Sequence, residues 1–245
     1  MNFKIGKLLV LVTLLAGAHS CSAAGDVRFR EGVTAYQAGQ FEPAARAFRN
    51  SLSQQAASGT LLNLGLAEWR QRRQGEAIRA WEQSAWLNPF DENARNNLSY
   101  AREMIFVNPP ELTRCELAST WLPASYWALI TSFSLWLAVA MVTLPRFFRA
   151  PKAGWHQTLA ALALGIFILS LPPNFGVITR AEIGIVIDKN TSLRLTPTQS
   201  AETVATLSAG EPVHRLRQRG EYFFVHTQSG NGWVRQAQMK FICPE

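Results

Sequence analysis

Cysteine and histidine are scarce in this chain, which has 3 of the first and 4 of the second among 245 residues. So few cysteines and histidines do not form a disulfide framework, and none of them has the spacing of a zinc site. The sequence also lacks a glycine-rich phosphate loop and a dinucleotide-binding fingerprint. No stretch of the sequence that is left without an assignment is long enough to form a separate catalytic domain around a nucleophile. We therefore predict no catalytic residue, no metal and no cofactor, and we interpret the chain as a protein other than an enzyme.

Acidic residues are missing around six of the 24 basic ones. Residues 25–120 carry 11 Lys/Arg and 11 Asp/Glu, and residues 181–245 carry 7 and 6, so both regions are nearly neutral. The net charge of +7 therefore indicates membrane targeting and topology, and it does not indicate a nucleic-acid-binding surface. The six basic residues without acidic neighbours all flank apolar runs: Lys4, Lys7, Arg146, Arg149, Lys152 and Arg180.

Charge of either sign is absent from two long stretches, residues 124–144 and 158–178. Each is long enough to cross the ~30 Å hydrocarbon core of a bilayer as a helix. We predict two transmembrane helices at these positions. The loop between them, residues 145–157, has three basic residues and no acidic one, so the positive-inside rule places it in the cytoplasm.

The first 24 residues have the layout of a secretory signal peptide, with two lysines, the apolar run Leu8–Ala16 and then small residues. An alternative is a lipoprotein signal in which Cys21 becomes the lipidated N-terminus. With a signal at 1–24 and a cytoplasmic loop, residues 25–120 and 181–245 both face outward. We predict a protein of the bacterial inner membrane with two spans and both terminal domains in the periplasm.

Residues 25–107 contain an internal repeat. Gly65 follows Gly32 by 33 residues, and Trp81 follows Phe48 by the same interval. This spacing resembles the tetratricopeptide repeat (TPR), which pairs two antiparallel helices in about 34 residues. The resemblance implies an all-α solenoid of two repeats and a capping helix. We predict helices near the following positions: 26–38, 42–54, 58–72, 75–87 and 91–106.

The concave face of a TPR solenoid usually binds peptides or extended segments of partner proteins. By position in the repeat, six residues are candidates for partner binding: Tyr36, Asn63, Leu66, Trp69, Arg70 and Asn97. An alternative is that the asparagines satisfy the backbone of the solenoid and that the apolar residues pack between helices. Two residues depart from the repeat pattern, because Glu68 and Gln74 stand where aromatic residues are usual.

Residues 181–245 consist of short apolar runs separated by turn residues, a pattern typical of a small β-domain. The order of four motifs resembles the bacterial SH3 (SH3b) family, although Tyr222 stands where that family usually has tryptophan. The resemblance implies a closed all-β barrel, and some SH3b domains bind cell-wall peptides. The four motifs are Leu193–Pro197, Leu207–Val213, Gly220–Val225 and Gly230–Val234.

One cysteine lies in the juxtamembrane linker, residues 108–123, and another lies near the end of the β-domain. Both Cys115 and Cys243 are predicted to lie outside the cytoplasm, where disulfides persist. A bond between them would hold the β-domain close to the membrane. The alternative is two thiols, and the sequence leaves both open.

The full order of signal peptide, TPR domain, two spans and SH3b-like domain is similar to that of BatE-type proteins of Bacteroides aerotolerance operons. This resemblance implies association with envelope proteins, including membrane proteins that carry von Willebrand factor A domains, and a role in stress tolerance. We therefore predict a membrane-anchored periplasmic scaffold that binds partners through its TPR groove. The alternative is a peptidoglycan-binding module that acts through the SH3b-like domain.

Overall fold

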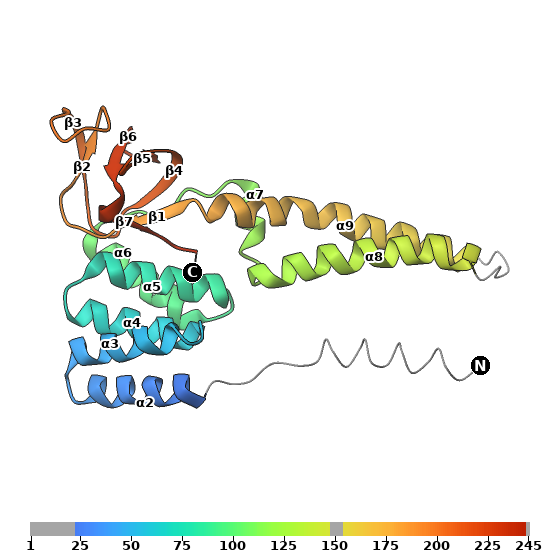
Figure 1. The fold of residues 1–245 in the computed structure, drawn as a ribbon, viewed down its shortest axis with the longest axis horizontal. Helices are drawn as coiled ribbons and strands as arrows, with labels where there is room; N and C mark the ends of the chain where they lie inside the picture. Colours follow the sequence, from blue (N-terminus) through green and yellow to red (C-terminus); the bar gives the residue numbers. More distant parts are fainter. Residues whose placement is uncertain (1–22, 148–153, 244–245) are drawn as a thin grey trace.

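The computed structural model of the chain describes residues 23–147 and 154–243. These residues form a helical module, a hairpin of two long helices and an antiparallel sheet (Figure 1). The helical module and the sheet are stacked on each other at one end of the hairpin, which projects away from both (Figure 1). Most of the predicted signal peptide and the centre of the predicted cytoplasmic loop lie outside the described residues.

The helical module has five helices, close to the predicted positions, and each packs against the next. The repeated glycines explain the 33-residue spacing. A Cβ atom at Gly32 would lie 2.6 Å from the Phe48 ring, and one at Gly65 would meet the Trp81 ring in the same way. Each glycine therefore lets a large ring fill the space between two helices. The helices are α2 (Ala23–Gln37), α3 (Phe41–Leu52), α4 (Ser58–Arg70), α5 (Gln74–Leu87) and α6 (Glu92–Ile105).

Glu68, which departs from the repeat pattern, is buried in α4 with 1% of its surface exposed. It forms an ion pair with Arg49 of α3, and its second oxygen lies 3.7 Å from Nη1 of Arg73. Burial raises the pKa of Glu68, and the two arginines offset only part of that effect. The carboxylate therefore links three successive segments of the module where the repeat usually has an aromatic ring.

The hairpin consists of α8 (Ala124–Phe147) and α9 (Gly154–Arg180). At 1.5 Å per residue the two helices are about 36 and 40 Å long, so both are long and apolar enough to cross a membrane. Large apolar side chains such as Phe133, Trp136 and Leu169 point outward, whereas small residues lie between the helices. This arrangement is typical of helices that face lipid, because the core helix of a water-soluble protein would bury these side chains.

A polar cluster joins the two hairpin helices. The side-chain amide of Asn174 donates to Oγ1 of Thr131 at 2.6 Å and to the Trp127 carbonyl at 3.2 Å. The hydroxyls of Thr131 and Ser170 lie 2.8 Å apart. Such bonds are worth about 0.6–2 kcal/mol each between helices in a membrane. They fix how α8 lies against α9.

The sheet has seven antiparallel strands in the order β3-β2-β6-β5-β4-β1-β7. No ladder joins β3 to β7 among the described residues, so the predicted closed barrel is wrong and the sheet is open. The helical module packs against the sheet at β1. Helices therefore bury this part of the sheet, which a closed barrel would bury with its own strands. The strands are β1 (Ile183–Val186), β2 (Thr191–Arg194), β3 (Thr203–Leu207), β4 (Pro212–Arg219), β5 (Tyr222–Thr227), β6 (Gly230–Arg235) and β7 (Met239–Phe241).

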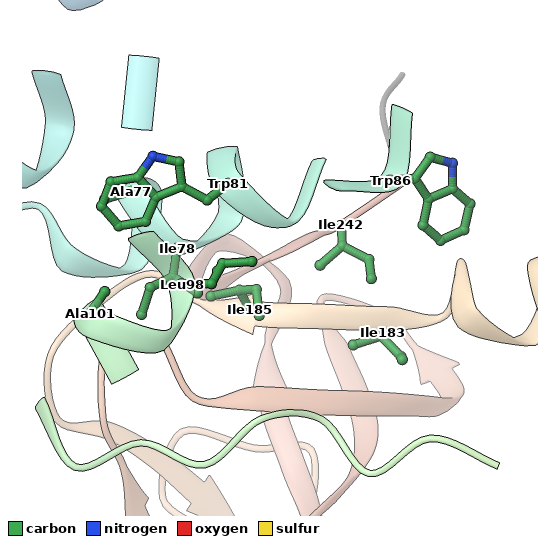
Figure 2. Close-up of a cluster of buried hydrophobic side chains, with 9 residues drawn as sticks. All are labelled: Ala77, Ile78, Trp81, Trp86, Leu98, Ala101, Ile183, Ile185 and Ile242. Carbon is green, nitrogen blue, oxygen red and sulfur yellow. The ribbon is translucent and has the colours of Figure 1, made fainter. Parts of the chain in front are cut away.

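Strand β1 is buried on both of its faces. Ile183 and Ile185 pack into a cluster with residues of α5 and α6, while Val186 belongs to the core of the sheet itself. Figure 2 shows Ile183, Ile185 and Ile242 next to the helices that carry Ile78 and Leu98. The helical and β regions, predicted as separate domains, therefore share one continuous core.

Polar contacts also join the helical module to the sheet. Arg79 donates to the Phe241 carbonyl at 3.0 Å, and Lys240 pairs with Glu76 at 2.5 Å. Gly75 lies so close to β1 that a Cβ atom there would be 2.5 Å from the Val186 carbonyl oxygen. The helical module precedes the first residue of α8, and the sheet follows the last residue of α9. Because the two regions are also packed together, they lie on the same side of the hairpin.

Candidate functional site

The predicted partner-binding residues lie on α2, α4 and α6, the first helix of each predicted unit. Tyr36 is in the last turn of α2, and Trp69 and Arg70 end α4. Tyr36 and Trp69 are half-buried, and Arg70 is exposed. The structure brings these three to one end of the module, where their side chains are accessible in part.

Five residues form a surface that we name the aromatic strip, defined as Tyr36, Phe41, Trp69, Arg70 and Tyr100. Ring contacts join the first group, Tyr36, Phe41 and Arg70, and the second, Trp69 and Tyr100, and the two groups meet where Trp69 and Arg70 are adjacent in the chain. The rings of Tyr36 and Phe41 meet edge to face at 5.4 Å between centroids. The guanidinium of Arg70 lies 5.9 Å from the centre of the Phe41 ring, and the rings of Trp69 and Tyr100 are 6.4 Å apart. The strip therefore draws side chains from four helices, α2, α3, α4 and α6.

Two members of the aromatic strip were not predicted. Phe41 begins α3, and Tyr100 lies on α6 with 56% of its surface exposed. Tyr100 could have been found from the sequence, because it is the aromatic residue of α6 that follows the repeated Asn97-Leu98 pair by two positions. Phe41 has no such signal, since its contact with Arg70 depends on how α3 packs against α4.

The other predicted residues, Asn63, Leu66 and Asn97, are also half-buried. Asn63 donates to the carbonyl of Gly59 in its own helix at 2.8 Å, which favours the alternative of a backbone-satisfying asparagine. Leu66 is partly buried against the shared core, and Asn97 is half-buried on α6.

A second concave region lies between the linker and the sheet. It is a cavity of about 460 Å³ with mainly apolar walls, among them Pro110, Leu112 and Leu216. At its inner end, Nε2 of His214 on β4 lies 3.4 Å from Oε1 of Glu116. Because a carboxylate can only accept, the imidazole donates in this pair.

Glu116 is held as a carboxylate by its neighbours. Burial alone would raise its pKa, but hydrogen bonds from the Thr113 backbone and from the side chains of Thr179, Thr113 and His214 outweigh burial and lower the pKa. The Thr113 amide donates to Oε2 at 2.8 Å and completes a capping box at the start of α7 (Arg114–Ser119). Glu116 therefore has a structural role in linking α7 to the sheet.

Cys115 and Cys243 are half-buried thiols in the structure. The Cys115 backbone packs against Gly176 of α9, and burial raises the pKa of the Cys243 thiol while the positive charge of Arg180 offsets part of the rise. Both cysteines are thus placed against the last turns of α9. The disulfide between them stays a prediction, which the mass of the oxidised protein would test.

Within the described ranges, no group of three or more His, Cys, Asp or Glu side chains is arranged to hold a metal ion. In comparisons with known proteins, no family model matches this chain and no curated protein matches it. A function can be argued from three features: the aromatic strip, the hairpin, and the packing of the helical module on the sheet that follows α9.

Proposed function

We propose that this chain is a membrane-anchored adaptor that binds an extended segment of a partner protein along the aromatic strip. The observation that carries the proposal is the strip itself, a set of partly exposed rings on α2, α3, α4 and α6. Tyrosine, tryptophan and arginine dominate the binding energy of protein interfaces. Four of the five members of the strip belong to these types, and the fifth is the phenylalanine Phe41.

The strip suits an extended segment better than a small molecule. Its contacts run across helix axes, so a bound chain would meet successive rings as it passes from one helix to the next. Arg70 presents an exposed guanidinium beside Phe41, and it can donate to the carbonyl groups or carboxylates of such a segment. The helix-to-helix order agrees with the TPR resemblance, which we retain as part of the proposal.

The setting supports an adaptor of the cell envelope. The module that carries the strip is packed on the sheet, and the sheet follows α9 after two residues. A partner held by the strip is thereby held at the membrane. We propose the periplasmic side for both regions, on the basis of the signal-like N-terminus and the basic loop. The BatE resemblance suggests membrane proteins with von Willebrand factor A domains as partners.

Site-specific photocrosslinking in the native membrane tests the adaptor function. A photoreactive residue at Tyr100 should form discrete adducts with one or a few proteins, and Arg70→Ala should reduce them several-fold. The matched control is the same photoreactive residue at Leu216, an apolar residue of β4 that is also about half exposed. Equal adducts from both positions, or adducts insensitive to Arg70→Ala, would contradict the proposed strip.

The peptidoglycan-binding alternative predicts a different outcome. In that case the purified full-length protein would be retained on isolated cell wall, and Arg70→Ala would leave retention unchanged. Substitution of an exposed residue of the sheet, such as Arg219→Ala, would reduce the retention on cell wall. Retention that depends on Arg219 and crosslinks that do not depend on Arg70 would together replace the adaptor with the wall-binding function.

A further inference from the structure

The short helix α7 connects the linker to the membrane hairpin, and its inner face is fixed by three contacts. The indole nitrogen of Trp127 in α8 donates to the Ser119 carbonyl at 3.2 Å. Arg180 at the end of α9 donates to the Ser119 hydroxyl at 3.3 Å. A Cβ atom at Gly176 would come within 2.7 Å of the Glu116 nitrogen, so α7 lies directly on the α9 backbone.

The opposite face of α7 is uncovered. Arg114 and Leu117 are three residues apart and project from the same side of α7, and Trp121 follows four residues later, in the turn after the helix. Leu117 is 54% exposed and Trp121 is 67% exposed, and Arg114 is also exposed. A cation, an aliphatic side chain and an indole in one exposed segment are the composition of a helix that lies in a membrane interface.

This face lies level with the open end of the hairpin. Trp121 precedes the first residue of α8 by three positions, and α7 packs on the last turns of α9. The exposed side chains of Phe175 and Ile178 lie in those same turns. The exposed apolar side chains of α7 and of the hairpin therefore lie at the same level along α9, where spanning helices leave the hydrocarbon.

We infer that the exposed surface formed by Arg114 and Leu117 of α7 and by Trp121 in the turn after it is a lipid-binding surface that lies in the headgroup region of the bilayer. Tryptophan favours this region because its ring is apolar and its N–H can still find water or a headgroup. Arginine there extends its guanidinium to phosphate while its stem stays in the apolar layer. The membrane would then cover the apolar surface of Leu117 and Trp121, which would otherwise be exposed to water.

The surface has a consequence for the rest of the molecule. Glu116 on the inner side of α7 is hydrogen-bonded to His214 of β4. An α7 held in the headgroup layer would therefore hold the sheet against the membrane surface, in addition to the direct connection through α9. A partner protein on this face is the competing occupant, and the test below separates the two.

Depth-dependent fluorescence quenching tests the inference on the full chain, reconstituted in phosphatidylcholine vesicles. Bromine atoms are placed either near the headgroup or near the chain ends of the lipid. The signal of one tryptophan is the difference between the wild type and its Trp→Phe variant. Two matched controls set the scale, namely Trp136, which faces outward in the middle of α8, and Trp233 on the sheet.

Headgroup-side bromines should remove most of the Trp121 signal and chain-end bromines much less, while iodide in the water should remove little. The Trp136 signal should show the reverse order of the two lipids, and neither lipid should affect Trp233. If iodide removes the Trp121 signal and neither lipid does, the face is exposed to water and the inference is wrong. If Trp136 also escapes both lipids, the hairpin itself is outside the bilayer, which contradicts the inference as well.

Discussion

The guanidinium of Arg180 lies 4.0 Å from the centre of the Trp86 ring, so the last residue of α9 rests on the helical module. A cation over an indole contributes up to about 2 kcal/mol when both are desolvated, and here Arg180 and Trp86 are both buried. Ile183, only three residues further along the chain, is already in the core shared with α5 and α6. The hairpin, the sheet and the helical module therefore meet within a few residues, and no flexible linker separates them at this point.

The shared core predicts that the helical module and the sheet unfold together. Ile185→Ala removes a fully buried side chain from the face of β1 that meets the helices, and it should cost about 2–5 kcal/mol. We expect the helical signal in far-ultraviolet circular dichroism and the fluorescence of Trp233 on the sheet to shift to lower denaturant together. Separate transitions in the wild type would contradict a continuous core.

Val186→Ala is the matched control for that experiment. Val186 is the next residue of β1, is equally buried and points into the core of the sheet. Because the two regions unfold as one unit, it should lower the helical signal and the Trp233 signal together, by roughly 1–3 kcal/mol. A helical signal that keeps the wild-type midpoint in Val186→Ala would contradict the shared core.

The sequence predicted the helices well because their spacing rule is local. Gly32 with Phe48 and Gly65 with Trp81 place small and large residues at fixed intervals within one repeat. The partner of β1 is not local, since no short-range pattern says which surface a strand will meet. The run from Ile183 to Ile187 did hold a signal, because an apolar strand without alternation is typical of burial on both faces.

The prediction of a closed barrel was wrong for a related reason. Turn and strand signals in residues 181–245 give the positions of strands, but closure depends on whether the two edge strands of the sheet, here β3 and β7, pair with each other. Here β7 pairs with β1 and β3 pairs with β2, and the helical module supplies the missing cover. Glu68 is similar, because only the packing of α3 on α4 brings Arg49 to it.

Gly176 predicts how α7 responds to a single added methyl group. In Gly176→Ala the new Cβ would overlap the Cys115 carbonyl and lie close to the Glu116 nitrogen, so α7 must move away from α9. We expect faster alkylation of the half-buried Cys115 thiol, measured by peptide mapping, with the helix content unchanged. Gly165→Ala on the same helix is the control, because nothing lies within 4 Å of its Cβ position. Equal alkylation rates in the two variants would show that α7 does not rest on Gly176.

Glu116 predicts a loss of stability in acid. Its pKa is lowered in the folded protein, so the unfolded chain takes up the proton first as the pH falls. The stabilisation is present above the ordinary glutamate pKa of about 4.3 and is lost as the pH falls through the lower folded value. The difference in melting temperature between the wild type and Glu116→Gln, measured in steps of about one pH unit, should therefore shrink as the pH falls below about 4.3. Glutamine can keep the capping box, so the helix start is preserved. A difference that is constant with pH would contradict the assignment.

Glu68 predicts the opposite dependence on pH, in the helical module. Its pKa is raised by burial, so the folded protein holds the proton to higher pH than the unfolded chain does. The contribution of Glu68 is fully present below about pH 4.3 and decreases as the pH rises through the folded value. Glu68→Gln removes this titration but keeps the size of the side chain, so the variant should gain stability relative to the wild type as the pH rises above 4.3. The measurement is the denaturant midpoint of the helical signal at successive pH values in both proteins. Because Arg49 and Arg73 are half-exposed, they can be solvated when the carboxylate is removed, and the variant should still fold. A wild type that becomes more stable than Glu68→Gln as the pH rises would mean that the two arginines outweigh burial.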